Sequence, residues 1–211
     1  MKDHWRKLWA VLPLNIEKKI HHSHFKALHI EWERAGSTLP VSHLSKQEMV
    51  KGYAKQNNLS VLVETGTYLG DMIFAMQDQF QQIFSIELSH HFYQRAVKRF
   101  KKFSKVQIIE GDSGEVLKNL VPALHGPALF WLDGHYSGGQ TAKGDKECPV
   151  FEELKNILHS PFNHVIIIDD ARLFKGENDY PTIDGLKEFV VKEKPESKLA
   201  FENDAIVITI K

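Results

Sequence analysis

Five short apolar runs, each closed by acidic residues and followed by a helical pattern, constrain the fold of this chain more than any other feature. With the acidic residues that close them, the runs occupy residues 61–64, 82–87, 106–112, 128–133 and 165–170, and the third strand itself is predicted at 106–110. The helices that follow them are predicted over 71–80, 91–103, 113–120, 150–158 and 183–191. Nearly continuous apolar strands that alternate with helices are typical of a buried parallel sheet covered on both faces. Two more strands, 198–202 and 205–210, flank the turn residues Asn203 and Asp204 and predict a closing antiparallel hairpin. The predicted fold is doubly wound, Rossmann-like α/β, with a seven-stranded and mostly parallel sheet.

The sequence before the first strand predicts two segments. Residues 4–35 have a helical composition interrupted at Pro13, and the stretch from Ala35 to Pro40 ends it. The pattern Ser45-Lys46-Gln47-Glu48 matches a capping box and predicts a helix that begins there. We therefore expect an N-terminal helical appendage or lid at residues 1–44 and one domain at residues 45–211.

Composition narrows the class of protein. Cys148 is the only cysteine, which excludes an intramolecular disulfide, and no apolar run approaches the roughly 18 residues of a membrane span. We expect a cytoplasmic protein with no membrane partner and no nucleic-acid partner, while a homo-oligomer stays open. Residues 1–60 hold ten Lys and Arg against five acids. This basic, His- and Trp-rich start is either a set of solvated helix faces or a cover that meets an anionic or sugar-like substrate.

The turn after the first strand predicts a binding site for a polar small molecule. It reads Glu64-Thr65-Gly66-Thr67-Tyr68-Leu69-Gly70 and leads into a helix predicted over 71–80. Glycine permits positive φ and a close approach of the backbone to a ligand. In a doubly wound sheet, ligands bind beyond the carboxyl ends of the strands, where this turn lies.

Glu87 indicates that the ligand contains a ribose. It follows Gly66 by 21 residues, the spacing at which a carboxylate at the end of the second strand reaches ribose hydroxyls. Dinucleotides and S-adenosylmethionine both satisfy this spacing. A dinucleotide favours G-x-G-x-x-G, and Thr67 occupies the middle glycine position, which argues against a pyrophosphate.

The ordered motifs resemble those of class I S-adenosylmethionine-dependent methyltransferases. They are Glu64 to Gly70, Glu87, Gly111-Asp112-Ser113 and Asp133. The resemblance covers about residues 45–211 and implies the following cofactor contacts. Glu64 and the backbone of Thr65, Gly66, Thr67, Tyr68 and Gly70 hold the methionyl part, Glu87 holds the ribose, and Asp112 with Ser113 holds the adenine edge. Asp112 could equally cap the helix that follows it.

A second resemblance concerns the metal. Leu132-Asp133-Gly134-His135-Tyr136 and Ile168-Asp169-Asp170 are similar to the magnesium site of metal-dependent O-methyltransferases that act on sugars and catechols. The resemblance implies Mg²⁺ ligands at Asp133, Asp169 and Asp170, with Asp133 and His135 as catalytic residues and His135 in the position of a general base. Three carboxylates at one sheet edge repel one another, and Mg²⁺ prefers oxygen ligands, which independently favours a cation there.

Other interpretations of these residues stay open. Asp169 or Asp170 could cap the next helix while Asp133 receives the methionyl amine, and His135 could be a histidine that only contacts substrate or solvent. The favoured function is methyl transfer from S-adenosylmethionine to a sugar-like or vicinal-diol hydroxyl with Mg²⁺ assistance. The alternatives are a non-catalytic S-adenosylmethionine-binding module and an NAD-binding oxidoreductase.

Overall fold

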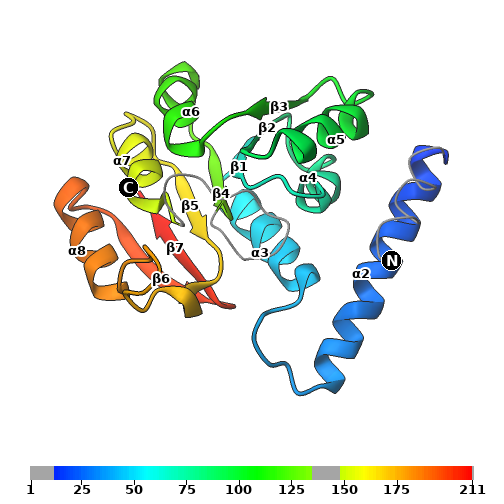
Figure 1. Cartoon of the computed structure of the whole chain (residues 1–211), viewed down its shortest axis with the longest axis horizontal. Coiled ribbons are helices and arrows are strands. Elements are labelled where there is room, and N and C mark those ends of the chain that lie inside the picture. Colours follow the sequence, from blue (N-terminus) through cyan, green and yellow to red (C-terminus); the bar gives the residue numbers. More distant parts are fainter. Residues whose placement is uncertain (1–11, 135–147, 211) are drawn as a thin grey trace.

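The sheet has seven strands in the order β3-β2-β1-β4-β5-β7-β6 (Figure 1). The computed structural model describes residues 12–134 and 148–210. The strands are β1 (Val61–Thr65), β2 (Gln82–Glu87), β3 (Val106–Glu110), β4 (Leu129–Leu132), β5 (Val165–Ile168), β6 (Lys198–Glu202) and β7 (Ala205–Thr209). The first five run parallel, and β7 pairs antiparallel with both β5 and β6. The predicted fold class and the C-terminal hairpin are therefore confirmed.

Helices cover both faces of this sheet. They are α2 (Leu14–Arg34), α3 (His43–Gln56), α4 (Asp71–Met76), α5 (His90–Phe100), α6 (Ser113–Leu120), α7 (Val150–Leu158) and α8 (Ile183–Glu193). Two short 3₁₀ segments, Val121–Ala123 and Ala171–Leu173, follow α6 and β5.

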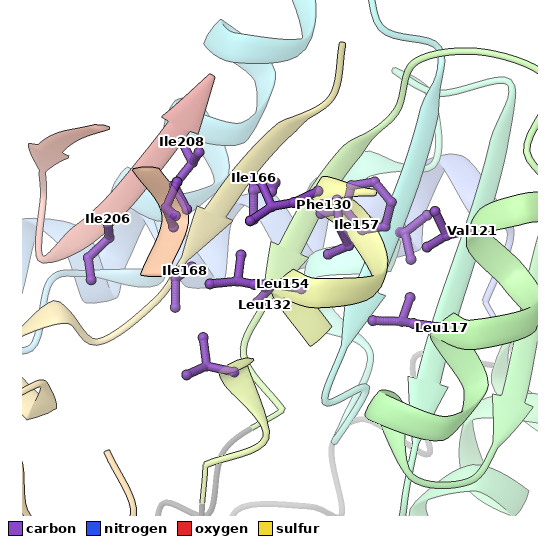
Figure 2. Close-up of a cluster of buried hydrophobic side chains, with 14 of the residues drawn as sticks. Leu117, Val121, Phe130, Leu132, Leu154, Ile157, Ile166, Ile168, Ile206 and Ile208 are labelled. Atoms are coloured by element: carbon purple, nitrogen blue, oxygen red, sulfur yellow. The ribbon is translucent and has the colours of Figure 1, made fainter. Parts of the chain in front are cut away.

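Alternating residues of the central strands supply two cores. In β5, Ile166 and Ile168 face the core that α6, α7 and α8 cover, as Figure 2 shows. Val165 and Ile167 face the other core, under α3, α4 and α5. This period of two explains why the strands read as unbroken apolar runs, because each face must be buried.

The boundaries of four helices differ from the predictions. α5 spans His90–Phe100, whereas a helix over 91–103 was predicted. α3 begins at His43 with Ser42 as its N-cap, and the Ser42 hydroxyl accepts the Ser45 N–H at 3.2 Å, so the predicted capping box at residues 45–48 is wrong. α4 ends at Met76 and not at Phe80, because the chain turns there to enter β2 and Gln81 donates to Ser60 O at 2.8 Å. α8 continues two residues past the predicted Val191.

α2 begins directly after Pro13 and lies at the periphery of the molecule (Figure 1). It packs on α3 and α4 through a narrow stripe that buries Glu17, His21 and Phe25. No helix in the described part of the chain is long and apolar enough to cross a membrane. The division into an appendage at 1–44 and a domain at 45–211 stays a prediction, and α3 starts two residues before that boundary.

Candidate functional site

The turn after β1 lies at the point where the strand order reverses. β1 has β2 on one side and β4 on the other, and doubly wound folds bind their ligands beyond the carboxyl ends of the strands at such a point. Gly66 (φ +82°) and Gly70 (φ +73°) have left-handed backbones. A Cβ on Gly66 would lie 2.3 Å from Asp133 O, so only glycine allows the turn to pack on the residue after β4.

Glu64 is buried beneath this turn. Its carboxyl accepts a hydrogen bond from the Ser85 hydroxyl, which in turn lies 2.6 Å from the Thr67 hydroxyl. Burial raises the pKa of Glu64 to about 8, and the Glu87 and Asp71 carboxylates act in the same direction. Glu64 is therefore largely protonated at neutral pH, and it supports the turn through the Ser85 hydroxyl, which contacts Thr67.

Glu87 holds the turn from the end of β2. Its Oε2 accepts the Tyr68 N–H at 2.7 Å and its Oε1 accepts the Ser89 N–H at 2.8 Å. Burial raises the pKa of Glu87, while these backbone donors oppose the rise. Both oxygens retain lone pairs that could accept further hydrogen bonds, as a ribose would require.

Asp112 and Ser113 lie at the start of α6. The Asp112 carboxylate caps this helix and accepts the Glu115 N–H at 3.2 Å, as the capping alternative predicted. Ser113 is buried beside Glu153 of α7, a residue that the sequence reasoning missed. Burial raises the pKa of Glu153 to about 7, although the nearby Ser113 and Thr65 side chains oppose the rise.

The three aspartates predicted as metal ligands come together. Asp133, Asp169 and Asp170 each place a carboxylate oxygen within 4.8 Å of the others. The backbone brings them there, because Asp133 N donates to Thr65 O at 3.1 Å and Asp169 N donates to Leu132 O at 3.0 Å. Burial raises the pKa of Asp133 well above its usual range, and the Asp169 charge adds to this. Burial likewise raises the pKa of Asp169 to about 6.

Two basic side chains contact these aspartates. Lys46 of α3 forms an ion pair with Asp169 and lies 3.3 Å from Asp170 Oδ1. Arg172 donates to the same Asp170 oxygen at 2.7 Å and also binds Asp204 in the turn between β6 and β7. Sequence reasoning treated Lys46 only as part of a capping pattern. Its position three and four residues before the buried Met49 and Val50 is the signal that places it on the inner face of α3.

His135 and the glycine-rich loop at residues 136–147 lie outside the described residues. The role of His135 as a base therefore stays a prediction. Of the His- and Trp-rich start, α2 supplies His21, which lies 3.5 Å from Asp71 and packs against Phe25 and Phe74. Arg99 also pairs with Asp71, at 3.0 Å, and donates to Leu69 O. α2 is thus linked to the last residues of the glycine turn.

A groove of about 540 Å³ lies between α3 and the turn that joins β6 to β7. Its polar lining includes His29, Ser45, Glu48, Tyr53, Glu202 and Asn203. Ser45 and Asn203 directly precede Lys46 and Asp204, so the groove borders the residues that contact the aspartates. Hydroxyl, amide and carboxylate groups of this kind are suited to binding a hydroxylated molecule.

Comparison with known proteins supports the fold. No family model and no curated protein matches the sequence. Among solved structures, the O-methyltransferase TomG from Streptomyces achromogenes, in complex with SAM, is similar at 16% identity over 90% of this chain and 88% of that chain, with a TM-score of 0.59. An O-methyltransferase from Bacillus cereus in complex with SAH has 13% identity over 90% and 91%, with a TM-score of 0.59. The SAH-bound methyltransferase PaMTH1 from Podospora anserina has 20% identity over 95% and 97%, with a TM-score of 0.55.

Proposed function

We propose that this protein is an S-adenosylmethionine-dependent methyltransferase that acts on a hydroxyl oxygen of a small, sugar-like or vicinal-diol acceptor, with Mg²⁺ assistance. One observation carries the proposal. The glycine turn packs directly on the backbone of Asp133, whose carboxylate belongs to the aspartate cluster. A methyl donor on the turn and an acceptor oxygen at the cluster would therefore be neighbours. The similar solved structures, two of them O-methyltransferases, share this fold.

The cofactor contacts follow from the strand ends. The backbone of Thr65 to Gly70 would hold the methionyl group, Glu87 would accept hydrogen bonds from the ribose, and Ser113 would lie at the adenine edge. Glu64, which is bonded to Ser85, would act by keeping the turn in shape. The transfer breaks the S–CH₃ bond, forms an O–CH₃ bond and releases the acceptor proton, so positioning and exclusion of water would dominate the rate.

The aspartate cluster fits a divalent cation. It offers three hard oxygen donors within 4.8 Å of one another, and burial makes their ionised forms costly without a positive charge. Asp133, Asp169 and Asp170 would hold Mg²⁺, which when bound polarises acceptor oxygens and lowers the pKa of a hydroxyl. His135 would receive the proton, and the groove beside α3 would receive the acceptor.

Calorimetric titration with S-adenosylhomocysteine, run once with Mg²⁺ and once with EDTA, tests the proposal. Micromolar binding would support the cofactor assignment. An acceptor screen with sugars and diols should then show turnover that EDTA abolishes. Asp133→Ala should lose the metal-stimulated turnover and largely keep cofactor affinity. Equal turnover with and without EDTA would remove Mg²⁺ from the proposal, and tighter binding of NAD than of S-adenosylhomocysteine would overturn the cofactor assignment.

A further inference from the structure

Lys46 brings a positive charge to the aspartate cluster from a distant part of the sequence. It precedes Asp169 by 123 residues, and its ammonium group contacts Asp169 Oδ2 and lies 3.3 Å from Asp170 Oδ1. Only 14% of its side chain is exposed. The helix that carries it is fixed, because Met49, Val50 and Ala54 of α3 are buried in the core. The contact is thus built into the packing of α3 on the sheet.

The oxygen that Lys46 contacts is the one that a metal ion would need. Asp169 Oδ1 already accepts the Asp170 N–H at 2.8 Å. Oδ2 is therefore the Asp169 oxygen best placed to bind a cation, and it contacts the lysine ammonium. Mg²⁺ binds carboxylate oxygens at about 2.0–2.1 Å. An ammonium group and a divalent ion on the same oxygen would lie close together and repel each other, because both are positively charged.

Lys46 also supplies charge to the whole cluster. Its ammonium group contacts Asp169 and lies 3.3 Å from Asp170. Its positive charge therefore offsets part of the repulsion among the three carboxylates. Arg172 is a separate case, because it divides its hydrogen bonds between Asp170 and Asp204.

We propose that Lys46 is an exchangeable internal cation, which neutralises the aspartate cluster in the metal-free protein and must leave Asp169 when a divalent ion binds. This inference rests on the metal site of the proposed function. It makes a prediction about affinity that the metal site alone does not make: removing Lys46 should strengthen metal binding. A lysine that helped to build the metal site would have the opposite effect when removed.

The test is a titration with Mn²⁺, followed by the electron paramagnetic resonance signal of the free ion. Lys46→Met should bind Mn²⁺ about tenfold more tightly than the unmodified protein, because a competing unit charge is gone. Lys46→Arg keeps that charge and should bind no more tightly. Lys51→Met is the matched control, since Lys51 lies on the same helix and pairs with Glu48 at 2.9 Å; its affinity should not change.

Thermal unfolding gives a second readout that does not depend on activity. Mn²⁺ should raise the melting temperature of Lys46→Met by more than it raises that of the unmodified protein. If Lys46→Met binds Mn²⁺ with an affinity equal to or weaker than that of the unmodified protein, Lys46 does not compete with the metal ion. The proposed metal site itself would still stand. If neither protein binds Mn²⁺, the proposed metal site is wrong, and so is the proposal that Lys46 competes with a metal ion. Binding of S-adenosylhomocysteine, measured separately, shows whether the cofactor assignment survives that outcome.

Discussion

Glu87 and Tyr68 join the end of β2 to the glycine turn after β1. The Tyr68 N–H donates to Glu87 Oε2 at 2.7 Å, and the Ser89 N–H donates to the other carboxylate oxygen at 2.8 Å. Tyr68 has a left-handed backbone (φ +46°), which costs free energy for a residue with a side chain. The hydrogen bond to Glu87 helps to hold the turn in this conformation.

Glu87→Gln should therefore weaken cofactor binding even though glutamine has nearly the same shape. Its amide NH₂ would face either the Tyr68 N–H or the Ser89 N–H, and one of these donors would lose its acceptor. We expect at least a tenfold loss of affinity for S-adenosylhomocysteine, corresponding to about 1.4 kcal/mol. Glu110→Gln, at the exposed end of the neighbouring strand, is the control and should bind normally when measured by calorimetry. Unchanged affinity in Glu87→Gln would contradict the assignment.

Glu153 should make stability depend on pH. Its pKa is about 7 in the folded protein and near 4.5 when exposed, so the folded state holds its proton more tightly. Such a group contributes stability that is fully present below pH 4.5 and is lost as the pH rises through 7. Glu153→Gln keeps the hydrogen-bonding capacity without the charge. At pH 8.5 it should be more stable than the unmodified protein by about 3 kcal/mol, at about 1.4 kcal/mol per pKa unit.

Urea unfolding at several pH values would measure this effect. The two proteins should converge well below pH 4.5, where Glu153 is protonated in both the folded and the unfolded state. Glu188→Gln, at an exposed position of α8, is the control. A constant difference between Glu153→Gln and the unmodified protein across the whole range would refute the assigned protonation.

Arg172 should contribute to stability because it supplies the positive charge that compensates the buried Asp204 carboxylate. Only 2% of the Asp204 side chain is exposed, and its carboxylate accepts both the Arg172 guanidinium and the Arg172 N–H, the latter at 2.9 Å. Arg172→Met leaves this carboxylate buried without its charged partner, which should cost about 1–3 kcal/mol of unfolding free energy. Adding Asp204→Asn should restore part of the loss, since the amide oxygen can still accept the backbone N–H. If Arg172→Met loses no more unfolding free energy than Lys175→Met, the Arg172–Asp204 pair contributes little to stability.

Gly66→Ala tests the packing of the turn on Asp133. The new Cβ would lie 2.3 Å from a backbone oxygen at a positive φ, so the turn must move away from β4. We expect weaker binding of S-adenosylhomocysteine and a loss of about 2 kcal/mol or more in stability. Gly52→Ala is the contrasting variant, because a Cβ there meets nothing within 4 Å inside a helix. It should stabilise the protein by about 0.5–1 kcal/mol, as measured by chemical denaturation.

Much of the fold could be predicted because the strand and helix signals are local. The bounds of β2, β3, α6 and α7 coincide with the predicted ranges. These segments combine strong apolar periodicity with clear turn residues or caps, as at Asp112 before α6. α3 was misplaced because Ser42 and Ser45 both precede the helical pattern, and the local sequence does not decide which one caps it.

The contacts that complete the candidate site could not be predicted, because they join residues far apart in sequence. The strand ends predicted that Asp133, Asp169 and Asp170 would meet, since parallel strands share one carboxyl edge. Nothing in the local pattern pairs Lys46 with Asp169, or Arg172 with Asp204. The first pairing depends on how α3 packs across the sheet, and the second depends on where the β6–β7 hairpin joins the sheet. Both are determined by tertiary packing.

The position of β7 has a consequence for how the protein is made. β7 lies between β5 and β6, and its antiparallel direction brings Asp204 to the edge that carries Asp169 and Asp170. During synthesis, β5 therefore remains an open sheet edge with apolar side chains until residues 198–210 have left the ribosome. A nascent chain in that interval would have an uncovered Ile166–Ile168 segment and an Arg172 without its Asp204 partner. Completion of the last strand would close the core and give Arg172 its Asp204 partner in one step.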